Sequence, residues 1–431
     1  MPTPPSAVLE LARTLMGAGF ETWCVGGAVR DAFLGISHLD WDLATSARPE
    51  IVQRLFRRTV PVGLKFGTVG VLDRNGLMHE VTTFRRDFNS DGRHAEVEFG
   101  VSLHDDLARR DFTINAMAWH PLEQRLEDPF NGRDDLERGL VRAVGVAEER
   151  FHEDRLRALR AIRFASRFDF AIEADTWSAI KTSAPHMGRL SAERVKQELE
   201  KTMEQVVRPS HALQLWQSSG AFETLVPVLA SVAERDLLAT DALALPGPAS
   251  RPLRRTLRFA ALFAGIDSRA LSGVLRSLKF SNAETAAIIS LADSWNVHGG
   301  AIGARLLEAS EIPDRDVRRW VARVGRLRVA AFGRLAAAMW WADRKLGKPA
   351  PSPRACRVLY RQLLTIAFRD PIESGDLAID GDDLRRLGVT PGPAMGKVLH
   401  ALTAFVLDDP ARNSVDTLTN EVRRLATELS A

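Results

Sequence analysis

The chain contains 431 residues, which allows two to four domains of roughly 150 residues each. It carries 58 lysine and arginine residues against 55 aspartate and glutamate residues, and its net charge of +3 allows a polyanionic partner without requiring one. Its two cysteines, Cys24 and Cys356, exclude a disulfide framework and match no zinc motif. No run of about 20 apolar residues occurs and residues 1–5 lack the pattern of a signal peptide, so we expect a soluble, cytoplasmic protein without a membrane partner.

The first predicted elements enclose a pair of glycines. A helix is predicted over residues 6–18, followed by a strand at 23–25 and a second helix at 28–34. Gly26 and Gly27 fill the turn between that strand and the second helix. Backbone N–H groups at such a turn can point at an anion, and the helix dipole favours negative charge there. The turn is therefore a candidate phosphate cradle.

Two carboxylates, separated by one residue, follow the second helix. Side chains alternate between the faces of a strand, so Asp40 and Asp42 share one face while their apolar neighbours face the core. Paired carboxylates suit Mg²⁺, a hard cation that takes oxygen ligands together with substrate phosphates. Either motif alone is more often structural, the glycine pair as a plain turn and the aspartates as a solvated strand edge. Together, in the order strand, turn, helix, strand, they indicate nucleotidyl transfer.

Asn75-Gly76 lies between two apolar runs and predicts a β-hairpin of residues 68–73 and 78–83. Glu80 lies in the second strand of this hairpin. It is either a third carboxylate beside the aspartates or a solvated strand residue. Residues 87–93 are polar and rich in turn formers, which predicts a mobile loop.

Residues 109–115 offer polar side chains to a nucleotide. Arg110 can hold a triphosphate through bidentate hydrogen bonds, and Asn115 can contact a ribose. An Arg-Asp pair such as Arg110–Asp111 is more often a surface ion pair, so this segment alone is weak evidence.

The strand patterns nearly vanish after about residue 145, and helical periodicity continues from there. Proline-rich stretches at 245–252 and 348–353 divide this helical part into subdomains. The sequence therefore predicts an α+β fold with a mixed sheet and helices first, followed by an all-helical remainder.

Residues 153–164 are predicted to be helical throughout, which would make Asp154 and Arg157 neighbours on the helix surface. The pair is either a surface salt bridge, worth about 0.3–0.5 kcal/mol, or a reader of a nucleobase. In the second interpretation, Asp154 accepts from the exocyclic amine of C or A and Arg157 donates to the adjacent ring acceptor. The carbonyl oxygen of U or G would repel the carboxylate. Arg160 and Arg163 continue the basic stripe and could contact phosphates.

In their order and spacing, these motifs resemble those of the bacterial class II tRNA nucleotidyltransferases, the CCA-adding enzymes, and of the related poly(A) polymerases. The resemblance covers residues 20–205, and residues 379–396 resemble a recurrent tail motif of the same family. The matching segments are residues 26–31 with Asp40 and Asp42, 110–115, 128–132, 153–157 and 191–194.

The resemblance implies four domains: a polymerase-β-type nucleotidyltransferase head over residues 1–147, a helical neck over 148–245, a helical body over 246–347 and a helical, tRNA-binding tail over 348–431. It also implies an enzyme that adds or repairs the 3′-terminal CCA of tRNA from CTP and ATP without a nucleic-acid template. Pyrophosphate would be released at each step.

The resemblance also assigns roles to residues. Asp40 and Asp42 would bind Mg²⁺ as catalytic residues, with Glu80 as a further catalytic candidate. The expected nucleotide contacts are Gly26, Gly27, Arg30, Arg110, Asp111, Asn115, Asp154, Arg157, Arg160 and Arg163.

Several alternatives stay open at this point. They are a poly(A) polymerase, an enzyme that adds only CC or only A, a non-catalytic tRNA-binding protein and an unrelated nucleotide-binding regulator. The oligomeric state is also open. Ala264 and Gly265 stand where some relatives carry a metal-binding His-Asp pair, so we expect no phosphohydrolase activity. Arginines at 315, 319, 323 and 326 either follow tRNA phosphates or form a solvated face.

Overall fold

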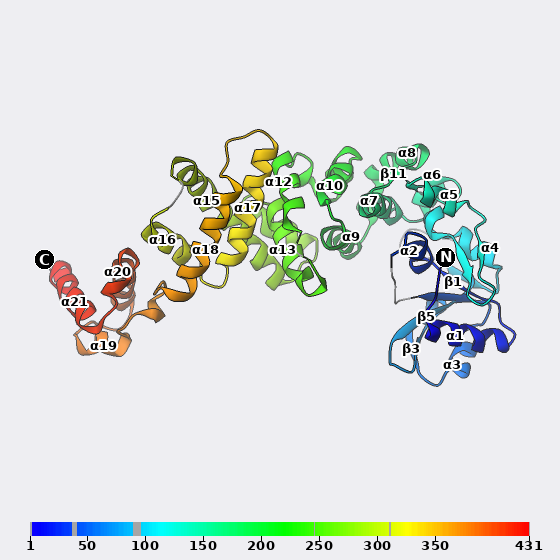
Figure 1. Cartoon of the computed structure of the whole chain (residues 1–431), viewed down its shortest axis with the longest axis horizontal. Helices are drawn as coiled ribbons and strands as arrows, with labels where there is room; N and C mark the ends of the chain where they lie inside the picture. The colour runs from blue at the N-terminus through cyan, green and yellow to red at the C-terminus, as the bar shows by residue number, and fades with distance from the viewer. Residues whose placement is uncertain (1, 37–40, 89–95, 245, 310–311, 431) are drawn as a thin grey trace. The chain divides into compact units, whose positions relative to one another are not determined.

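The computed structural model describes residues 2–36, 41–88, 96–244, 246–309 and 312–430. The chain divides into two compact units, Met1–Ser231 and Val232–Ala431. Among the described residues, every strand lies in the first unit and the second unit is helical (Figure 1). The predicted fold class is confirmed.

A seven-stranded mixed sheet forms the centre of the first unit. Its strand order is β3-β4-β5-β2-β1-β8-β9, in which β2 and β5 are parallel neighbours and the other pairs are antiparallel. The strands of this sheet are β1 (Thr22–Val25), β2 (Asp42–Thr45), β3 (Thr59–Gly63), β4 (Thr68–Leu72), β5 (Met78–Thr83), β8 (Ala118–His120) and β9 (Arg125–Glu127). Two smaller sheets pair β6 (Arg85–Phe88) with β7 (Glu96–Phe99) and β10 (Leu140–Val141) with β11 (Ala171–Ile172).

The helices of the first unit surround this sheet and extend beyond it. The α-helices are α1 (Ser6–Gly17), α2 (Gly27–Phe33), α3 (Pro49–Leu55), α4 (Leu103–Ala108), α5 (Gly132–Glu137), α6 (Ala147–Glu153), α7 (Leu156–Phe168), α8 (Ala174–Ser183), α9 (Ala192–Gln205), α10 (Pro209–Ser218) and α11 (Ala221–Leu225). The short 3₁₀ helices are η1 (Leu64–Phe66), η2 (Thr113–Asn115), η3 (Ala184–Arg189) and η4 (Pro227–Leu229).

The two faces of the large sheet have different neighbours. α1 and α3 pack on one face, where α1 buries a stripe of apolar residues at helical spacing. On the other face, Val25 belongs to an apolar cluster that includes Leu107 of α4. Val25 pairs directly with Asp42 across β1 and β2, so the Asp42 side chain is on this second face. The sheet thus has α1 and α3 on one face and the candidate site on the other.

The elements predicted around the glycine turn and the hairpin are observed within one residue at each end: α1, β1, α2, β4 and β5. The prediction of a loop over residues 87–93 is wrong for its first residues. Asp87 lies in β6, where it pairs with Val97 of β7 and with the Arg85 and Arg109 guanidinium groups. Residues 89–93 lie outside the described residues.

The prediction of one continuous helix over residues 153–164 is also wrong. α6 ends at Glu153, Asp154 adopts extended backbone angles (φ −150°, ψ 104°), and α7 begins at Leu156. The Asp154 carboxylate accepts from the Leu156 backbone N–H at 3.0 Å. Aspartate competes for backbone donors in this way, which favours helix termini over helix interiors. Asp154 and Arg157 therefore lie at a helix junction, not on one helix face.

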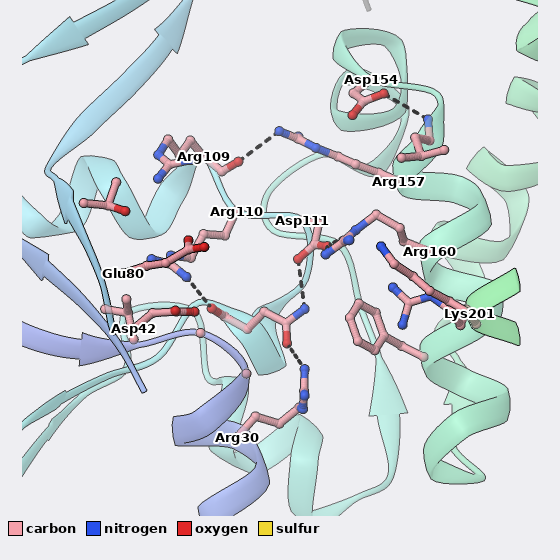
Figure 2. A pocket seen from close by; sticks show the side chains of 18 of the residues that line it. Arg30, Asp42, Glu80, Arg109, Arg110, Asp111, Asp154, Arg157, Arg160 and Lys201 are labelled. Carbon is pink, nitrogen blue, oxygen red and sulfur yellow. Dashed lines mark hydrogen bonds and ion pairs between the residues drawn. The ribbon is translucent and has the colours of Figure 1, made fainter. Parts of the chain in front are cut away.

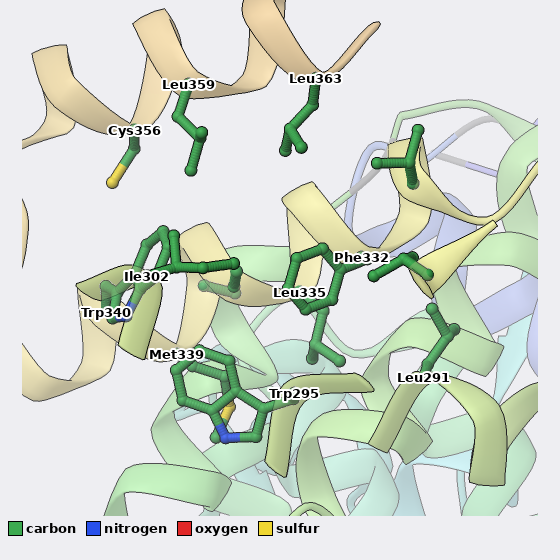
Figure 3. Close-up of a cluster of buried hydrophobic side chains, with 14 of the residues drawn as sticks. Leu291, Trp295, Ile302, Phe332, Leu335, Met339, Trp340, Cys356, Leu359 and Leu363 are labelled. Atoms are coloured by element: carbon green, nitrogen blue, oxygen red, sulfur yellow. The ribbon is translucent and has the colours of Figure 1, made fainter. Parts of the chain in front are cut away.

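The second unit is built around a core shared by three long helices (Figure 3). Trp295 of α15, Phe332 and Trp340 of α17, and Leu363 of α18 are buried there. Gly303 lies under Trp340, because a Cβ at Gly303 would be 2.8 Å from the indole Nε1. The α-helices of this unit are α12 (Glu234–Ala239), α13 (Arg251–Leu262), α14 (Ser268–Ser277), α15 (Asn282–Glu308), α16 (Asp314–Val324), α17 (Val329–Lys345), α18 (Pro353–Arg369), α19 (Gly381–Arg386), α20 (Pro393–Asp408) and α21 (Val415–Ser430). Its 3₁₀ helices are η5 (Asp241–Leu243), η6 (Pro248–Ser250), η7 (Ser374–Asp376) and η8 (Pro410–Arg412).

In the described part of the chain, no helix is both long enough and apolar enough to cross a bilayer.

A tight turn before α5 holds that helix against η2. The Asp128 carboxylate accepts from the backbone N–H groups of Gly132 at 2.7 Å and Arg133 at 2.9 Å. The Thr113 hydroxyl donates to the Asp135 carboxylate at 2.7 Å. The approach is so close that a Cβ at Gly132 would lie 2.1 Å from the Thr113 carbonyl oxygen. Only glycine fits at this position without displacing η2.

We expect Gly132→Ala to lower the free energy of unfolding by about 1–3 kcal/mol, because the added methyl group forces two backbone segments apart. Thermal unfolding followed by circular dichroism measures the change. Gly17→Ala is the matched control, since a Cβ at Gly17 meets no atom within 4 Å. A Gly132→Ala midpoint equal to that of the control would contradict the packing of α5 on η2.

Candidate active site

A cavity of about 880 Å³ lies in the first unit, lined by β2, β4 and β5 of the large sheet and by α7 and α9 (Figure 2). Every candidate residue that the structure describes lines this cavity, and Asp40 lies outside the described residues. The carboxylates that line it are Asp42, Glu80, Asp111 and Asp154. The basic side chains that line it are Arg30, Arg85, Arg109, Arg110, Arg157, Arg160, Arg163, Arg167, Arg194 and Lys201.

Asp42 and Glu80 come from neighbouring strands. The parallel register of β2 and β5 pairs Leu43 with Val81, and one residue earlier it brings Asp42 beside Glu80. Both side chains are half-buried and both line the cavity. Two carboxylates from adjacent strands supply the oxygen ligands that a hard divalent cation prefers, so the donor set fits such an ion.

The glycine turn lies next to these carboxylates. Gly26 has a φ of +76°, and a Cβ there would be 3.6 Å from the Asp42 carboxylate and 3.4 Å from the Arg110 guanidinium. Glycine therefore provides both the backbone angle and the space beside Asp42. Gly27 begins α2 at the same end of the cavity.

Arg30 is buried beneath the cavity, with 3 % of its surface exposed. It donates to the Asp31 carboxylate at 2.6 and 2.8 Å and to the Asn115 side-chain oxygen at 2.5 Å. Its guanidinium also stacks over the Phe168 ring at 4.7 Å. Burial lowers the pKa of Arg30, against the attraction of Asp31. These contacts indicate a positioning role, and direct contact with a triphosphate stays a prediction.

Asn115 and Asp111 extend this network to α7. The Asn115 side-chain N–H donates to one Asp111 oxygen at 2.9 Å, and Arg160 donates to the other at 2.8 Å (Figure 2). Burial alone would raise the pKa of Asp111, but Arg160 and Asn115 outweigh it and hold that pKa below its usual range. A chain of four side chains, from Arg30 to Arg160, thus connects α2 with α7.

Arg109 and Arg110 share a partner that the sequence reasoning missed. The buried Asp106 carboxylate accepts from Arg109 at 2.8 Å and from Arg110 at 3.1 Å. Burial alone would raise the pKa of Asp106, and the two arginines reverse the shift so that its pKa is lowered. The spacing of three and four residues on a helix opened by Ser102 was a usable signal for this partner.

Asp154 and Arg157 each have a different partner from the one that the helical prediction implied. Arg194 of α9 donates to the Asp154 carboxylate at 2.6 Å. Arg157 donates to Glu153 at 2.9 Å and to the Arg109 carbonyl oxygen at 3.0 Å. No local pattern could have found the Arg194 contact, because 40 residues separate the two partners.

Arg163 forms a buried ion pair with Glu198 of α9, with 2.6 Å between the guanidinium Nε and the carboxylate oxygen. Burial lowers the pKa of Arg163, against the attraction of Glu198. Lys201 also contacts Glu198, at 3.4 Å, and lines the cavity. This pair fixes the cavity wall of α7 against α9, and contact of Arg163 with phosphates stays a prediction.

Some members of the arginine stripe in the second unit form ion pairs with neighbouring helices. Arg319 pairs with Asp408 at 2.6 Å, and Arg326 pairs with Asp376. Half of the Arg319 side chain and 64 % of the Arg315 side chain remain exposed. The stripe is therefore partly structural, and contact with RNA stays a prediction.

Paired carboxylates on a mixed sheet, a glycine turn beside them and a basic wall opposite define a nucleotidyltransferase. Residues 22–142 match the family model of the poly A polymerase head domain, and residues 169–232 match that of the probable RNA and SrmB-binding site of polymerase A. The chain is 35% identical over 425 residues to the CCA-adding enzyme of Geobacillus kaustophilus, covering 97% of this chain and 96% of the other. The chain belongs to the family of CCA-adding enzymes, as the motifs predict.

Two further comparisons agree. The CCA-adding enzyme of Lactiplantibacillus plantarum is 34% identical over 435 residues, covering 99% of this chain and 98% of the relative. The crystal structure of the Bacillus stearothermophilus CCA-adding enzyme in complex with CTP superposes with a TM-score of 0.76 at 30% identity, over the full length of both chains. The predicted family, fold class and enzyme class are thereby confirmed.

We expect Asn115→Ala to lower the free energy of unfolding by about 1–3 kcal/mol, because it removes one buried hydrogen-bond partner from Arg30 and one from Asp111. Denaturant unfolding measures this loss. Gln53→Ala removes an exposed amide from α3 and is the matched control. Equal stability of the two variants would show that Asn115 does not hold the network together.

Proposed function

We propose that this chain adds or repairs the 3′-terminal CCA of tRNA from CTP and ATP without a nucleic-acid template. One observation carries the proposal: a single cavity holds the Asp42–Glu80 pair at the sheet and Asp154 with Arg157 at the junction of α6 and α7. The first pair suits phosphoryl chemistry and the second suits recognition of a base. The relative from Bacillus stearothermophilus, whose structure contains CTP, supports a pyrimidine nucleotide as one substrate.

Asp42 and Glu80, with Asp40, are the residues that would hold Mg²⁺ in this proposal. A bound Mg²⁺ would supply Lewis-acid activation of the RNA 3′-hydroxyl and charge neutralisation at the α-phosphate. The chain itself would mainly position the substrates. Arg110 lies beside the glycine turn, held by Asp106, and would bind the triphosphate next to Gly26 and Gly27.

Asp154 and Arg157 would select the base. Each Asp154 oxygen already accepts one hydrogen bond, from Leu156 or from Arg194, and each keeps a lone pair for another donor. The exocyclic amine of C or A supplies such a donor, whereas U and G present a carbonyl oxygen that the carboxylate repels. Selection of C and A together follows from this one difference.

Domains and compartment are part of the same proposal. The head over residues 1–147 would carry catalysis, the neck over 148–245 base selection, and the body over 246–347 and tail over 348–431 contact with tRNA. The reaction would take place in the cytoplasm, the compartment of its RNA and nucleotide substrates. The buried, unpaired thiols of Cys24 and Cys356 suit such a reducing setting.

The direct test is extension of three tRNAs, ending before CCA, after C and after CC, by the purified protein with Mg²⁺, CTP and ATP. Sequencing of the 3′ ends should show CCA on all three, with arrest there. Arrest at CC, A added only to the CC substrate, or long A runs would each replace the proposal by a related activity. Absence of extension would favour a binding protein.

We expect Asp42→Asn to reduce the extension rate by at least about 10²-fold, because it removes one of the three carboxylate charges that would hold the metal. Single-turnover kinetics on the tRNA ending in CC measure this effect. Glu127→Gln removes an exposed carboxylate from β9 of the same sheet and should keep the wild-type rate. A near-normal rate for Asp42→Asn would refute the assignment of the carboxylates.

We expect Asp154→Ala to reduce the preference for CTP over UTP by about 10- to 100-fold, the effect of losing a hydrogen bond to a charged group. Competing CTP and UTP on the tRNA that ends before CCA measures this preference. Glu137→Ala, an exposed carboxylate on α5, is the control. Unchanged discrimination in Asp154→Ala would refute the base-reading role.

A further inference from the structure

We propose that an exposed apolar surface on the outer strands of the sheet supports the last unpaired base of the RNA acceptor strand. We call this surface the edge shelf and define it by Val60, Val62, Phe66 and Met78. The inference rests on the proposed function and extends it to the placement of the second substrate.

The edge shelf is an unusual concentration of exposed apolar side chains. Val60 is 39% exposed, Val62 44%, Phe66 48% and Met78 37%. With Leu64 and Leu77, the region between residues 60 and 78 holds six of the eighteen large apolar side chains that are exposed in the described residues. Exposed apolar side chains that gather in one place mark a binding surface more often than single scattered ones do.

Strand register places Val60 and Met78 of the edge shelf on the same face as the catalytic carboxylates. Gly70 of β4 pairs with Glu80 of β5 on one side and with Val60 of β3 on the other. Residues paired directly across antiparallel strands direct their side chains to the same face. Met78 also shares this face, since it precedes Glu80 by two residues in β5.

Gly70 has no side chain, so the sheet backbone is open at the centre of the edge shelf. A Cβ at Gly70 would lie 2.7 Å from the Met78 sulfur and 2.9 Å from a Val62 methyl carbon. The side chains of Val62 and Met78 therefore approach each other over the glycine backbone. They form one apolar surface that begins at Met78, two residues before Glu80 in β5.

A second contact joins the edge shelf to the cavity. The Arg85 guanidinium lies over the Phe66 ring at 5.6 Å and donates to the Phe66 carbonyl oxygen. Arg85 itself lines the cavity. A strand of RNA that contacts Phe66 thus meets a cation at the entrance to the candidate active site.

The geometry of the reaction identifies the occupant. The strands follow the order β1, β2, β5, β4, β3, so the glycine turn after β1 and the edge shelf lie on opposite sides of Asp42 and Glu80. In-line displacement requires the attacking hydroxyl and the leaving pyrophosphate on opposite sides of the α-phosphate. If the triphosphate occupies the glycine turn, the RNA 3′ end must approach from the edge shelf.

The chemistry of the edge shelf also suits this occupant. The terminal base of the acceptor strand is the base that precedes CCA at the first step and C at the next two, so its site cannot read one particular hydrogen-bonding edge. Valine and methionine side chains make apolar contact with the face of any base, and the Phe66 ring can stack on it, an interaction that is tolerant of sequence.

Photocrosslinking tests the location without requiring turnover. The probe is a tRNA that lacks CCA and ends in 4-thiouridine, irradiated with the full-length protein and digested with trypsin. We expect a crosslink in the peptide of residues 59–65, which contains Val60 and Val62 and excludes Glu80. Crosslinks confined to α7 and α9, or absent from residues 59–65, would overturn the proposal.

Kinetics of a shelf variant provide the second test. We expect Val60→Ser/Val62→Ser to raise the KM for tRNA about ten-fold through the lost apolar contact with the base, with the KM for CTP unchanged. Leu122→Ser, a 39% exposed leucine between β8 and β9, is the matched control and should change neither constant. An unchanged KM for tRNA would overturn the proposal, even if the variant altered self-association.

The two tests separate this inference from the proposed function. If the wild-type protein extends tRNA but forms no crosslink in residues 59–65, the edge shelf is wrong and the function stands. If the crosslink forms but no nucleotide is added, the RNA site stands and the proposed reaction fails.

Discussion

The Asp111 carboxylate accepts hydrogen bonds from Arg160 and Asn115 at the same time, and the rest of the cavity depends on this pair of contacts. Asn115 passes the connection to Arg30, which is almost fully buried and also bound by Asp31. One carboxylate therefore fixes the glycine-turn helix α2 relative to the long helix α7. Removing one partner of a buried charge commonly costs about 3–5 kcal/mol, so the contacts that shape the site also stabilise the first unit.

Other buried carboxylates also hold arginines in place around the cavity wall. Asp106 holds Arg109 and Arg110, Glu198 holds Arg163, and Asp111 holds Arg160. The wall is therefore a set of oriented ion pairs whose guanidinium groups have little conformational freedom left. Cations fixed in this way need little reorganisation when phosphates arrive, which is how a charged site can bind substrate and stabilise developing charge.

The sequence predicted the local elements and the members of the site better than it predicted their partners. The glycine turn, the hairpin that carries Glu80 and the strand that begins at Asp42 depend on short-range signals. The helix junction at Asp154 was missed because apolar periodicity continues through it, while the break depends on a side-chain contact to the backbone of Leu156. Arg194 contacts Asp154 at the junction and Glu198 contacts Arg163 of α7, and both contacts form only because α9 packs against α7. Such contacts between distant segments have no local pattern.

The strand order of the sheet arranges the features of the site in a line across one face. Across the strand order β1, β2, β5, β4, β3, the face that carries Val25 presents in turn the glycine turn, Asp42, Glu80, the glycine floor of Gly70 and the exposed side chain of Val60. Polar character is highest at the carboxylates and gives way to apolar character within two strands, a distance of about 10 Å at ordinary strand spacing. A nucleoside triphosphate suits the polar part of this face, and an unpaired base suits the apolar part. The reacting groups of both substrates would then meet over the carboxylates, where the charge that develops during transfer can be balanced.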